Sequence, residues 1–229
     1  MTVLDQPAAP ASRTMLAAGF ILIYAFLIGF TDNFVQTIAR DGGLWQFQAT
    51  RTLFAALILA VVARPMGLNL RPANYGVVVA RSLIHGLSMV IYFGCLAFLS
   101  VAEVAAGLFT APIFVLLIAR FGFGQPIGPL RIAAVVVGFA GVLMVLGIGP
   151  GTALTPSLIL PVLAGAMYAA GNVATREWCA DETPETLLLG FFLALGLLGL
   201  VGMAALGLWQ PEAPDGPEGF VLRGLVWPT

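Results

Sequence analysis

The stretch that decides the fold is residues 75–99, YGVVVARSLIHGLSMVIYFGCLAFL. It is long and apolar enough to cross a hydrocarbon core, which takes roughly 20 residues of helix. Working outward, similar stretches predict spans over residues 15–38, 44–63, 104–121, 132–148, 157–175 and 187–209, and residues 220–229 resemble the start of another helix. The expected fold is therefore all-α, a polytopic membrane helix bundle of about seven transmembrane helices plus the start of an eighth.

The composition agrees with a chain that lies in lipid. Hydrophobic residues make up 60% of the 229 residues and charged residues 9%, whereas a soluble domain carries about 25% charged residues. The mean hydropathy is +1.00. The net charge of −1 offers no basic patch to nucleic acid. We therefore expect the lipid bilayer as the main partner and exclude nucleic acid.

The arginines outside the predicted spans indicate the orientation. If residues 1–14 form a cytoplasmic tail, the inner side carries more of these arginines than the outer side: Arg13, Arg64, Arg71, Arg120, Arg131 and Arg176 inside, against Arg40 and Arg223 outside. Cytoplasmic loops are enriched in Lys and Arg. The distribution favours a multi-pass protein of the bacterial inner membrane with a cytoplasmic N-terminus.

A weak internal repeat divides the chain. The sequence DNFV at residues 32–35 aligns with GNVA at residues 171–174, and each is followed by a short loop and another span. Five spans precede the second copy, and an odd number of spans inverts its orientation in the membrane. Inverted repeats are typical of secondary transporters. We predict a five-helix repeat over residues 15–148 and a partial second repeat over residues 157–229, an inverted 5+5 arrangement cut short.

Polar residues inside the span at residues 75–99 are candidates for a substrate pathway. Arg81, His85, Ser88, Tyr92 and Cys95 follow one another at steps of three or four, so they share one helix face. An Arg at the centre of a span costs about 2.5–3.5 kcal/mol on insertion scales, which favours a face turned toward the bundle interior or a watery cavity. In the alternative, Arg81 reaches the cytoplasmic interface and His85 makes a hydrogen bond between helices.

Further candidates lie on other spans. Tyr168 and Asn172 share a face of residues 157–175 and could line the opposite wall, although polar side chains also join membrane helices without touching a substrate. Asp32, Arg51 and Glu103 are candidate coupling or structural charges. Asp32 could accept a coupling proton, and Arg51 could either pair with Asp32 or reach toward the outer surface.

The sequence contains no motif for catalysis. It has no phosphate-binding loop, no metal-ligand cluster and no nucleophile beside a base, and the two cysteines have no disulfide or metal spacing. We therefore expect no enzyme activity, no cofactor and no metal. A membrane-embedded enzyme acting on lipid stays open as an alternative, with Asp181, Glu182 and Glu185 as its carboxylates.

Three motifs carry a family resemblance. The stretches YFGCLAFLSVAEVAA (residues 92–106), TAPIF (110–114) and GFAGVLMV (138–145) resemble the EamA domain of the drug/metabolite transporter superfamily. The resemblance implies a secondary transporter that moves a small metabolite, such as an amino acid or a related compound, by alternating access through a central cavity. It also implies that Arg81, Tyr92 and Asn172 belong to the substrate pathway. The chain could form a homodimer.

Three departures from the family pattern matter. Cys95 stands where Ala is usual, and Gly124-Gln125 stands where a Gly-Glu pair is usual. Family members typically have ten spans in two five-helix repeats, whereas this sequence stops at Thr229 after about seven, so we expect a fragment or a truncated protein. The alternative function is therefore a non-transporting membrane protein or an assembly partner.

Overall fold

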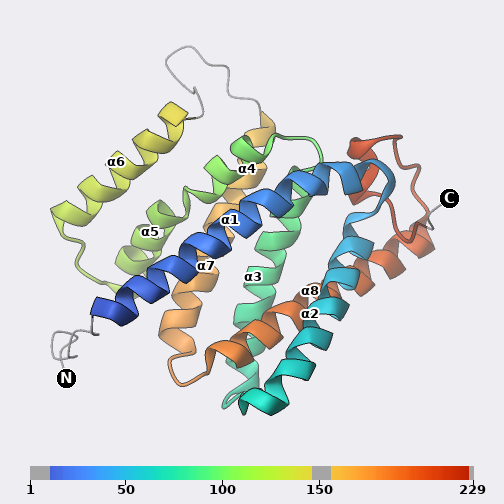
Figure 1. The fold of residues 1–229 in the computed structure, drawn as a ribbon. Coiled ribbons are helices and arrows are strands. Elements are labelled where there is room, and N and C mark those ends of the chain that lie inside the picture. The colour runs from blue at the N-terminus through green and yellow to red at the C-terminus, as the bar shows by residue number, and fades with distance from the viewer. Residues whose placement is uncertain (1–10, 146–155, 227–229) are drawn as a thin grey trace.

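The computed structural model describes residues 11–145 and 156–226, and within these residues every regular element is a helix (Figure 1). The α-helices are α1 Ala11–Asp41, α2 Leu44–Met66, α3 Tyr75–Cys95, α4 Val101–Leu108, α5 Ala111–Phe123, α6 Pro129–Val145, α7 Ile159–Trp178 and α8 Pro184–Trp209. Two short 3-10 helices, η2 Pro156–Leu158 and η3 Pro217–Val221, lie before α7 and after α8. The predicted all-α fold is confirmed.

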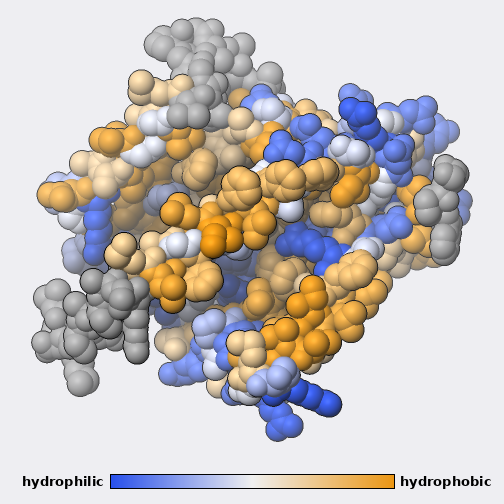
Figure 2. Space-filling view, viewed as in Figure 1, coloured by the Kyte–Doolittle hydropathy of each residue, from blue (hydrophilic) through white to orange (hydrophobic). Residues whose placement is uncertain are grey.

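Five helical stretches are long and apolar enough to cross a membrane: Met15–Asp41, Leu44–Met66, Tyr75–Cys95, Val101–Phe123 and Pro184–Trp209. Large apolar side chains cover much of their outer surface, with Phe26 72% and Leu208 91% exposed, and Figure 2 shows hydrophobic residues along α1 and α2. Soluble monomers rarely expose such extended apolar patches. The chain is a multi-pass membrane protein.

Two predicted spans differ from these five. The span predicted over residues 132–148 corresponds to α6, an apolar helix shorter than a full span, and residues 146–148 lie outside the described residues. The span predicted over residues 157–175 corresponds to α7, which is not among the five and extends to Trp178. The first helix begins at Ala11 rather than at Met15, and residues 1–10 lie outside the described residues.

The predicted fourth span consists of two helices, α4 and α5, with a turn at Phe109 and Thr110 between them. Pro112 in the first turn of α5 has no N–H to donate to the preceding turn. The Thr110 hydroxyl donates instead to the Gly107 carbonyl oxygen over 2.6 Å. Gly107 also packs so closely on Pro161 of α7 that an added Cβ would overlap it. The proline and this close contact explain the break.

Helices α7 and α8 form the centre of the packing. Helix α8 packs on α2 and α3, while α7 packs on α3, α4 and α5. Glycines allow the close approach of α8 to α2: a Cβ on Gly199 would lie 2.7 Å from the Trp45 carbonyl oxygen, and a Cβ on Gly202 would overlap the Trp45 ring. Helix α6 stands apart in Figure 1, and together with α5 it lines an apolar cavity of about 430 Å³.

The prediction that a helix begins at Phe220 is wrong for the described residues. The chain forms η3 and then continues without a helix over residues 222–226, and residues 227–229 lie outside the described part. Phe220 is fully buried, and Trp45 Nε1 donates to the Val221 carbonyl oxygen over 2.8 Å. Gln46 exchanges two hydrogen bonds with the backbone of Val226. These contacts hold the segment on the start of α2 and oppose its continuation as a helix.

Arg223 attaches the same segment to the end of α1. Its guanidinium donates to the carbonyl oxygens of Ala39, Arg40 and Gly42 over 3.0, 2.8 and 3.2 Å, and it also donates to the Pro214 carbonyl oxygen. The last carbonyls of a helix lack partners within the helix and carry partial negative charge, so a cation stabilises them. Arg223 therefore caps α1.

Candidate functional site

Asp32 on α1 and Tyr92 on α3 are joined inside the bundle. The Tyr92 hydroxyl donates to Asp32 Oδ2 over 2.6 Å, and both side chains are buried, with Asp32 only 5% exposed. A carboxylate removed from water needs hydrogen-bond donors because burying it unpaired is costly. One turn later on α1, the Gln36 amide donates to the Leu99 carbonyl oxygen over 3.1 Å. These two contacts hold the second half of α1 against the end of α3.

Arg51 on α2 lies against two aromatic rings. Its guanidinium carbon is 4.7 Å from the ring centroid of Phe93 on α3 and 5.6 Å from that of Phe192 on α8. These distances are within the range of cation–π attraction. Arg51 and Asp32 attract each other electrostatically, yet among the described residues they form no ion pair within 4.0 Å. Of the two alternatives for Arg51, direct pairing with Asp32 does not occur in this conformation, because Tyr92 occupies the carboxylate and the two phenyl rings hold the guanidinium.

His85 on α3 fills the space between α7 and α8. Its ring centroid is 5.1 Å from that of Tyr168 on α7 and 6.3 Å from that of Phe191 on α8. The ring lies directly on Gly171 of α7, where an added Cβ would overlap it. His85 Nδ1 is buried and has no hydrogen-bond partner among the described residues. His85 thus joins three helices mainly by packing.

These contacts link into one group of side chains from five helices, which we call the central cluster. Its members are Tyr24 and Asp32 from α1, Arg51 from α2, His85, Tyr92 and Phe93 from α3, Tyr168 from α7, and Phe191 and Phe192 from α8. Tyr24 is 65% exposed and borders the group, within electrostatic range of Tyr168, Arg51 and Asp32. Figure 2 shows a hydrophilic area recessed between α1 and α2.

Other predicted site residues on α3 join helices outside the central cluster. Arg81 Nε donates to Thr175 Oγ1 on α7 over 2.7 Å, and one of its terminal nitrogens donates to the Leu187 carbonyl oxygen on α8 over 3.2 Å. Ser88 is fully buried and donates to the Ala164 carbonyl oxygen on α7 over 2.8 Å. The helix face predicted for α3 therefore contacts α7, α8 and α1 at successive levels.

Asn172 and Glu103 have different surroundings. Asn172 is exposed on α7, and its amide is beside His85. Glu103 lies in the first turn of α4, where its carboxylate accepts hydrogen bonds from the backbone N–H and the hydroxyl of Ser100, while Glu103 N–H donates to Ser100 Oγ. This reciprocal arrangement is a capping box. The structure therefore places Glu103 in a helix cap and apart from the central cluster.

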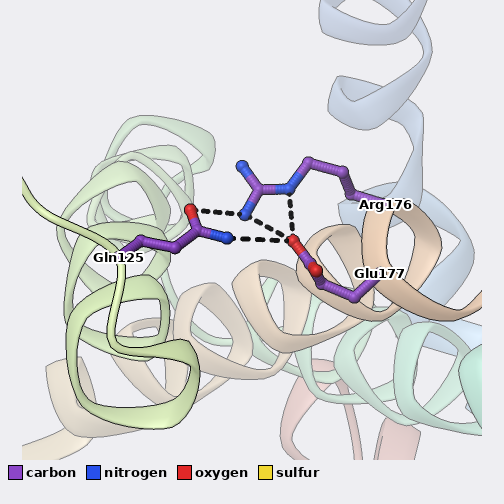
Figure 3. Close-up of polar contacts among 3 residues, drawn as sticks. All are labelled: Gln125, Arg176 and Glu177. Atoms are coloured by element: carbon purple, nitrogen blue, oxygen red, sulfur yellow. Dashed lines mark hydrogen bonds and ion pairs between the residues drawn. The ribbon is translucent and has the colours of Figure 1, made fainter. Parts of the chain in front are cut away.

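A polar cluster on the surface links the ends of α5 and α7 (Figure 3). Arg176 and Glu177 form an ion pair of 2.7 Å, and Gln125 donates to Glu177 over 3.3 Å and accepts from Arg176 over 3.1 Å. Gln125 is the residue found in place of the glutamate usual in the family pattern. Its amide serves as donor and acceptor at once, which a carboxylate could not do.

The comparison with known families agrees with this architecture. The profile of the EamA-like transporter family matches residues 15–147, more than half of the chain. The chain belongs to this family. The resemblance carried by the three sequence motifs is therefore confirmed, and the EamA-like match covers the region from α1 through α6.

Two curated relatives of this EamA-like chain are named riboflavin transporters. One, from Rhizobium johnstonii, is 29% identical over 120 residues, which cover 50% of this chain and 38% of the relative. The other, from Brucella anthropi, is 27% identical over 174 residues, which cover 75% of this chain and 59% of the relative. The aligned stretches thus span less than two thirds of either relative.

A solved crystal structure also resembles this EamA-like chain. It has 25% sequence identity and a TM-score of 0.53, and the match covers 85% of this chain and 72% of the other.

Several members of the central cluster were not predicted from the sequence. Tyr24, Phe93, Phe191 and Phe192 lie in apolar runs where one more aromatic residue carries no signal. Gln48 is likewise a new observation, since its side-chain amide is completely buried on α2 with no partner among the described residues. A polar residue one turn before Arg51 was the available signal for Gln48. For the aromatic residues, only the packing of distant helices identifies them.

Proposed function

We propose that this protein is a secondary transporter for a planar heteroaromatic metabolite, with riboflavin as the first candidate, and that the substrate binds at the central cluster. The observation that carries the proposal is the composition of this cluster: aromatic rings from four helices surround one carboxylate and one guanidinium. The names of the two curated relatives support the choice of riboflavin.

The chemistry of the cluster fits such a substrate. Ligand sites are lined mainly by apolar and aromatic side chains, with a few polar groups that fix orientation. The faces of Tyr24 and Tyr168 can stack on a flat ring system, while Arg51 offers hydrogen-bond donors and Asp32 offers acceptors. A flavin ring has a flat surface and a polar edge with both kinds of group, so it matches both features.

An aromatic amino acid is the second candidate. It is favoured by the pair of opposite charges, because Asp32 suits an ammonium group and Arg51 suits a carboxylate. The aromatic side chain would then occupy the same ring-lined space. The two candidates would bind at the same site. An amino acid would place charged groups on both Asp32 and Arg51, whereas a flavin ring would contact them through uncharged donors and acceptors.

Transport at this site requires access from each side of the membrane in turn. Helices contributed by an inverted pair of repeats can rock around a fixed central site, as in other secondary transporters. We propose this mechanism for the five-helix repeat at residues 15–148 and the partial repeat at residues 157–229. The arginine distribution supports a cytoplasmic N-terminus in a bacterial inner membrane.

The test is uptake by liposomes that contain the purified chain. Uptake is followed with radiolabelled riboflavin, with empty liposomes as the blank, and unlabelled riboflavin or phenylalanine is added as competitor. We expect saturable flavin uptake that riboflavin abolishes, and Tyr168→Ala should reduce it while Tyr75→Ala, a change at an exposed tyrosine, should not. Competition by phenylalanine would favour the second candidate. Binding without uptake would instead support the non-transporting alternative.

A further inference from the structure

The guanidinium of Arg51 is the least satisfied charged group of the central cluster. Its five N–H donors make no hydrogen bond and no ion pair with any residue that the structure describes, although Arg51 lies within a membrane-spanning helix. Arginines within spans usually face a watery cavity or pair with an opposite charge or with carbonyl groups, because an isolated charge in lipid is costly. The side chain therefore has unused binding capacity.

The way Arg51 is held leaves its donors available. Phe93 and Phe192 lie within cation–π distance of the guanidinium carbon, and a phenyl ring supplies no oxygen or nitrogen acceptor to its N–H groups. The N–H bonds lie in the plane and point outward from its edge. Arg51 is also only partly buried, so part of its side chain can be approached from outside the chain.

Asp32 does not use these donors. One of its carboxylate oxygens, Oδ2, accepts the hydrogen bond from Tyr92, and no ion pair to Arg51 forms among the described residues. The carboxylate still attracts the guanidinium from nearby, so it helps to hold the Arg51 charge inside the bundle. The group that fits the unoccupied N–H donors of Arg51 is then a planar group with two acceptor atoms, supplied by a molecule other than this chain.

We infer that Arg51 is the residue that determines substrate specificity at the central cluster, by binding two adjacent acceptor atoms of a planar substrate group through its N–H edge. The inference rests on the proposed function for the location of the substrate. Two groups have this chemistry: a carboxylate, and a ring carbonyl beside a ring-nitrogen acceptor, as on either side of the imide N–H of a flavin. Phe93 and Phe192 hold the guanidinium ready for either, which reduces the ordering that binding would require.

The first experiment measures binding to the purified full chain in lipid nanodiscs. The probes are riboflavin, a flavin methylated on the imide nitrogen so that its polar edge is altered, and phenylalanine. The variants are Arg51→Lys, which keeps the charge but loses the two-donor fork, and Arg51→Gln. Arg40→Gln is the matched control, since Arg40 is an exposed arginine at the end of α1.

We expect both Arg51 variants to bind riboflavin about 10- to 100-fold more weakly than the wild type, as for loss of a charge-assisted pair of hydrogen bonds. They should also lose most of the preference for riboflavin over the methylated flavin, while Arg40→Gln should keep both. If wild type binds riboflavin and both Arg51 variants bind it equally well, the inference is overturned while the proposed function stands. If wild type ignores both flavins but binds phenylalanine in an Arg51-dependent way, riboflavin is excluded and the carboxylate form of the inference holds.

A second measurement avoids the risk that the variants fail to fold. The wild-type chain is treated with an arginine-selective dicarbonyl reagent, and modification at Arg51 and Arg40 is read separately by mass spectrometry. Whichever of riboflavin and phenylalanine binds in the nanodisc assay should, at saturation, slow modification of Arg51 several-fold and leave modification of Arg40 unchanged. Equal modification of Arg51 with and without that compound would contradict the inference.

Discussion

Tyr92 on α3 donates a hydrogen bond of 2.6 Å to Asp32 on α1, and the two residues lie 60 positions apart in the sequence. Helix α1 has its most extensive packing in the described chain against η3, so this bond and the contact of Gln36 with Leu99 are what join the middle of α1 to α3 and the turn that follows it. The first prediction tests this bond.

Replacing Tyr92 by Phe should destabilise the protein by about 1–3 kcal/mol, because the buried Asp32 carboxylate loses a donor and gains none. The measurement is the thermal unfolding of the detergent-solubilised protein, followed by tryptophan fluorescence. Tyr75→Phe is the control, since Tyr75 is 68% exposed and should unfold like the wild type. Equal stability of Tyr92→Phe and wild type would mean that the bond contributes nothing.

Gly171 is expected to tolerate no side chain. In Gly171→Ala the new methyl group would overlap the His85 ring, so α3 and α7 must separate or the ring must move, at a cost of about 1–3 kcal/mol for overpacking. Gly138→Ala is the control, because no neighbouring atom lies within 4 Å of a Cβ there, and the higher helix propensity of Ala should leave stability equal or slightly increased. Unfolding is measured as above.

The clash at Gly171 can be separated from other effects by a second change. If His85 is the obstacle, Gly171→Ala should cost much less in a His85→Ala background than in the wild type, which a double-mutant cycle measures directly. Additive effects of the two changes would show that another neighbour causes the loss.

Arg223→Ala should loosen the end of α1. The variant removes the cation that binds the carbonyl oxygens of Ala39, Arg40 and Gly42, and such caps stabilise helix ends by up to about 2 kcal/mol when partly buried. Limited proteolysis between α1 and α2 should become faster. Arg40→Ala is the matched control, because only its backbone carbonyl takes part in this contact, and it should be cleaved at the wild-type rate.

The Cys179 thiol should react with maleimide only at elevated pH. Cys179 lies just after α7 and is almost completely buried, and this burial raises the pKa of its thiol, while the nearby Arg81 guanidinium lowers it. Since the thiolate is the reactive form, labelling in a Cys95→Ser background should increase as pH rises beyond the range of an ordinary thiol. In Arg81→Gln the lowering effect is lost, so the midpoint of the labelling curve should move to still higher pH. A midpoint that moves down or stays in place would contradict this assignment.

Much of the helical framework could be predicted because hydropathy and helical period are local properties. The face of α3 that carries Arg81, His85, Ser88 and Tyr92 does point into the bundle, as its spacing of three and four residues indicated. The fourth span was predicted as one helix over residues 104–121, although Pro112 within it was a signal for the interruption between α4 and α5.

The partners of these side chains could not be predicted. Arg51 contacts Phe93 and Phe192, which lie on helices far along the chain, and apolar runs rich in phenylalanine do not show which ring faces which helix. From the sequence, Arg51 could pair with Asp32 or reach toward the outer surface, and charge alone did not decide between them. In the structure a phenol and two phenyl rings provide the closer contacts for these two groups, so tertiary packing decided between alternatives that charge alone left open.

The attachment of α1 at one end has a mechanical consequence. Arg223 and η3 fasten the helix at Asp41, and Tyr92 supports it at Asp32, whereas its first half is almost entirely unburied by the rest of the chain. From Asp32 back to Ala11 the helix is roughly 30 Å long. With this geometry, a tilt of about 10° at Asp32 would displace the far end of the helix by about 5 Å, so a small change at one hydrogen bond would be amplified along α1.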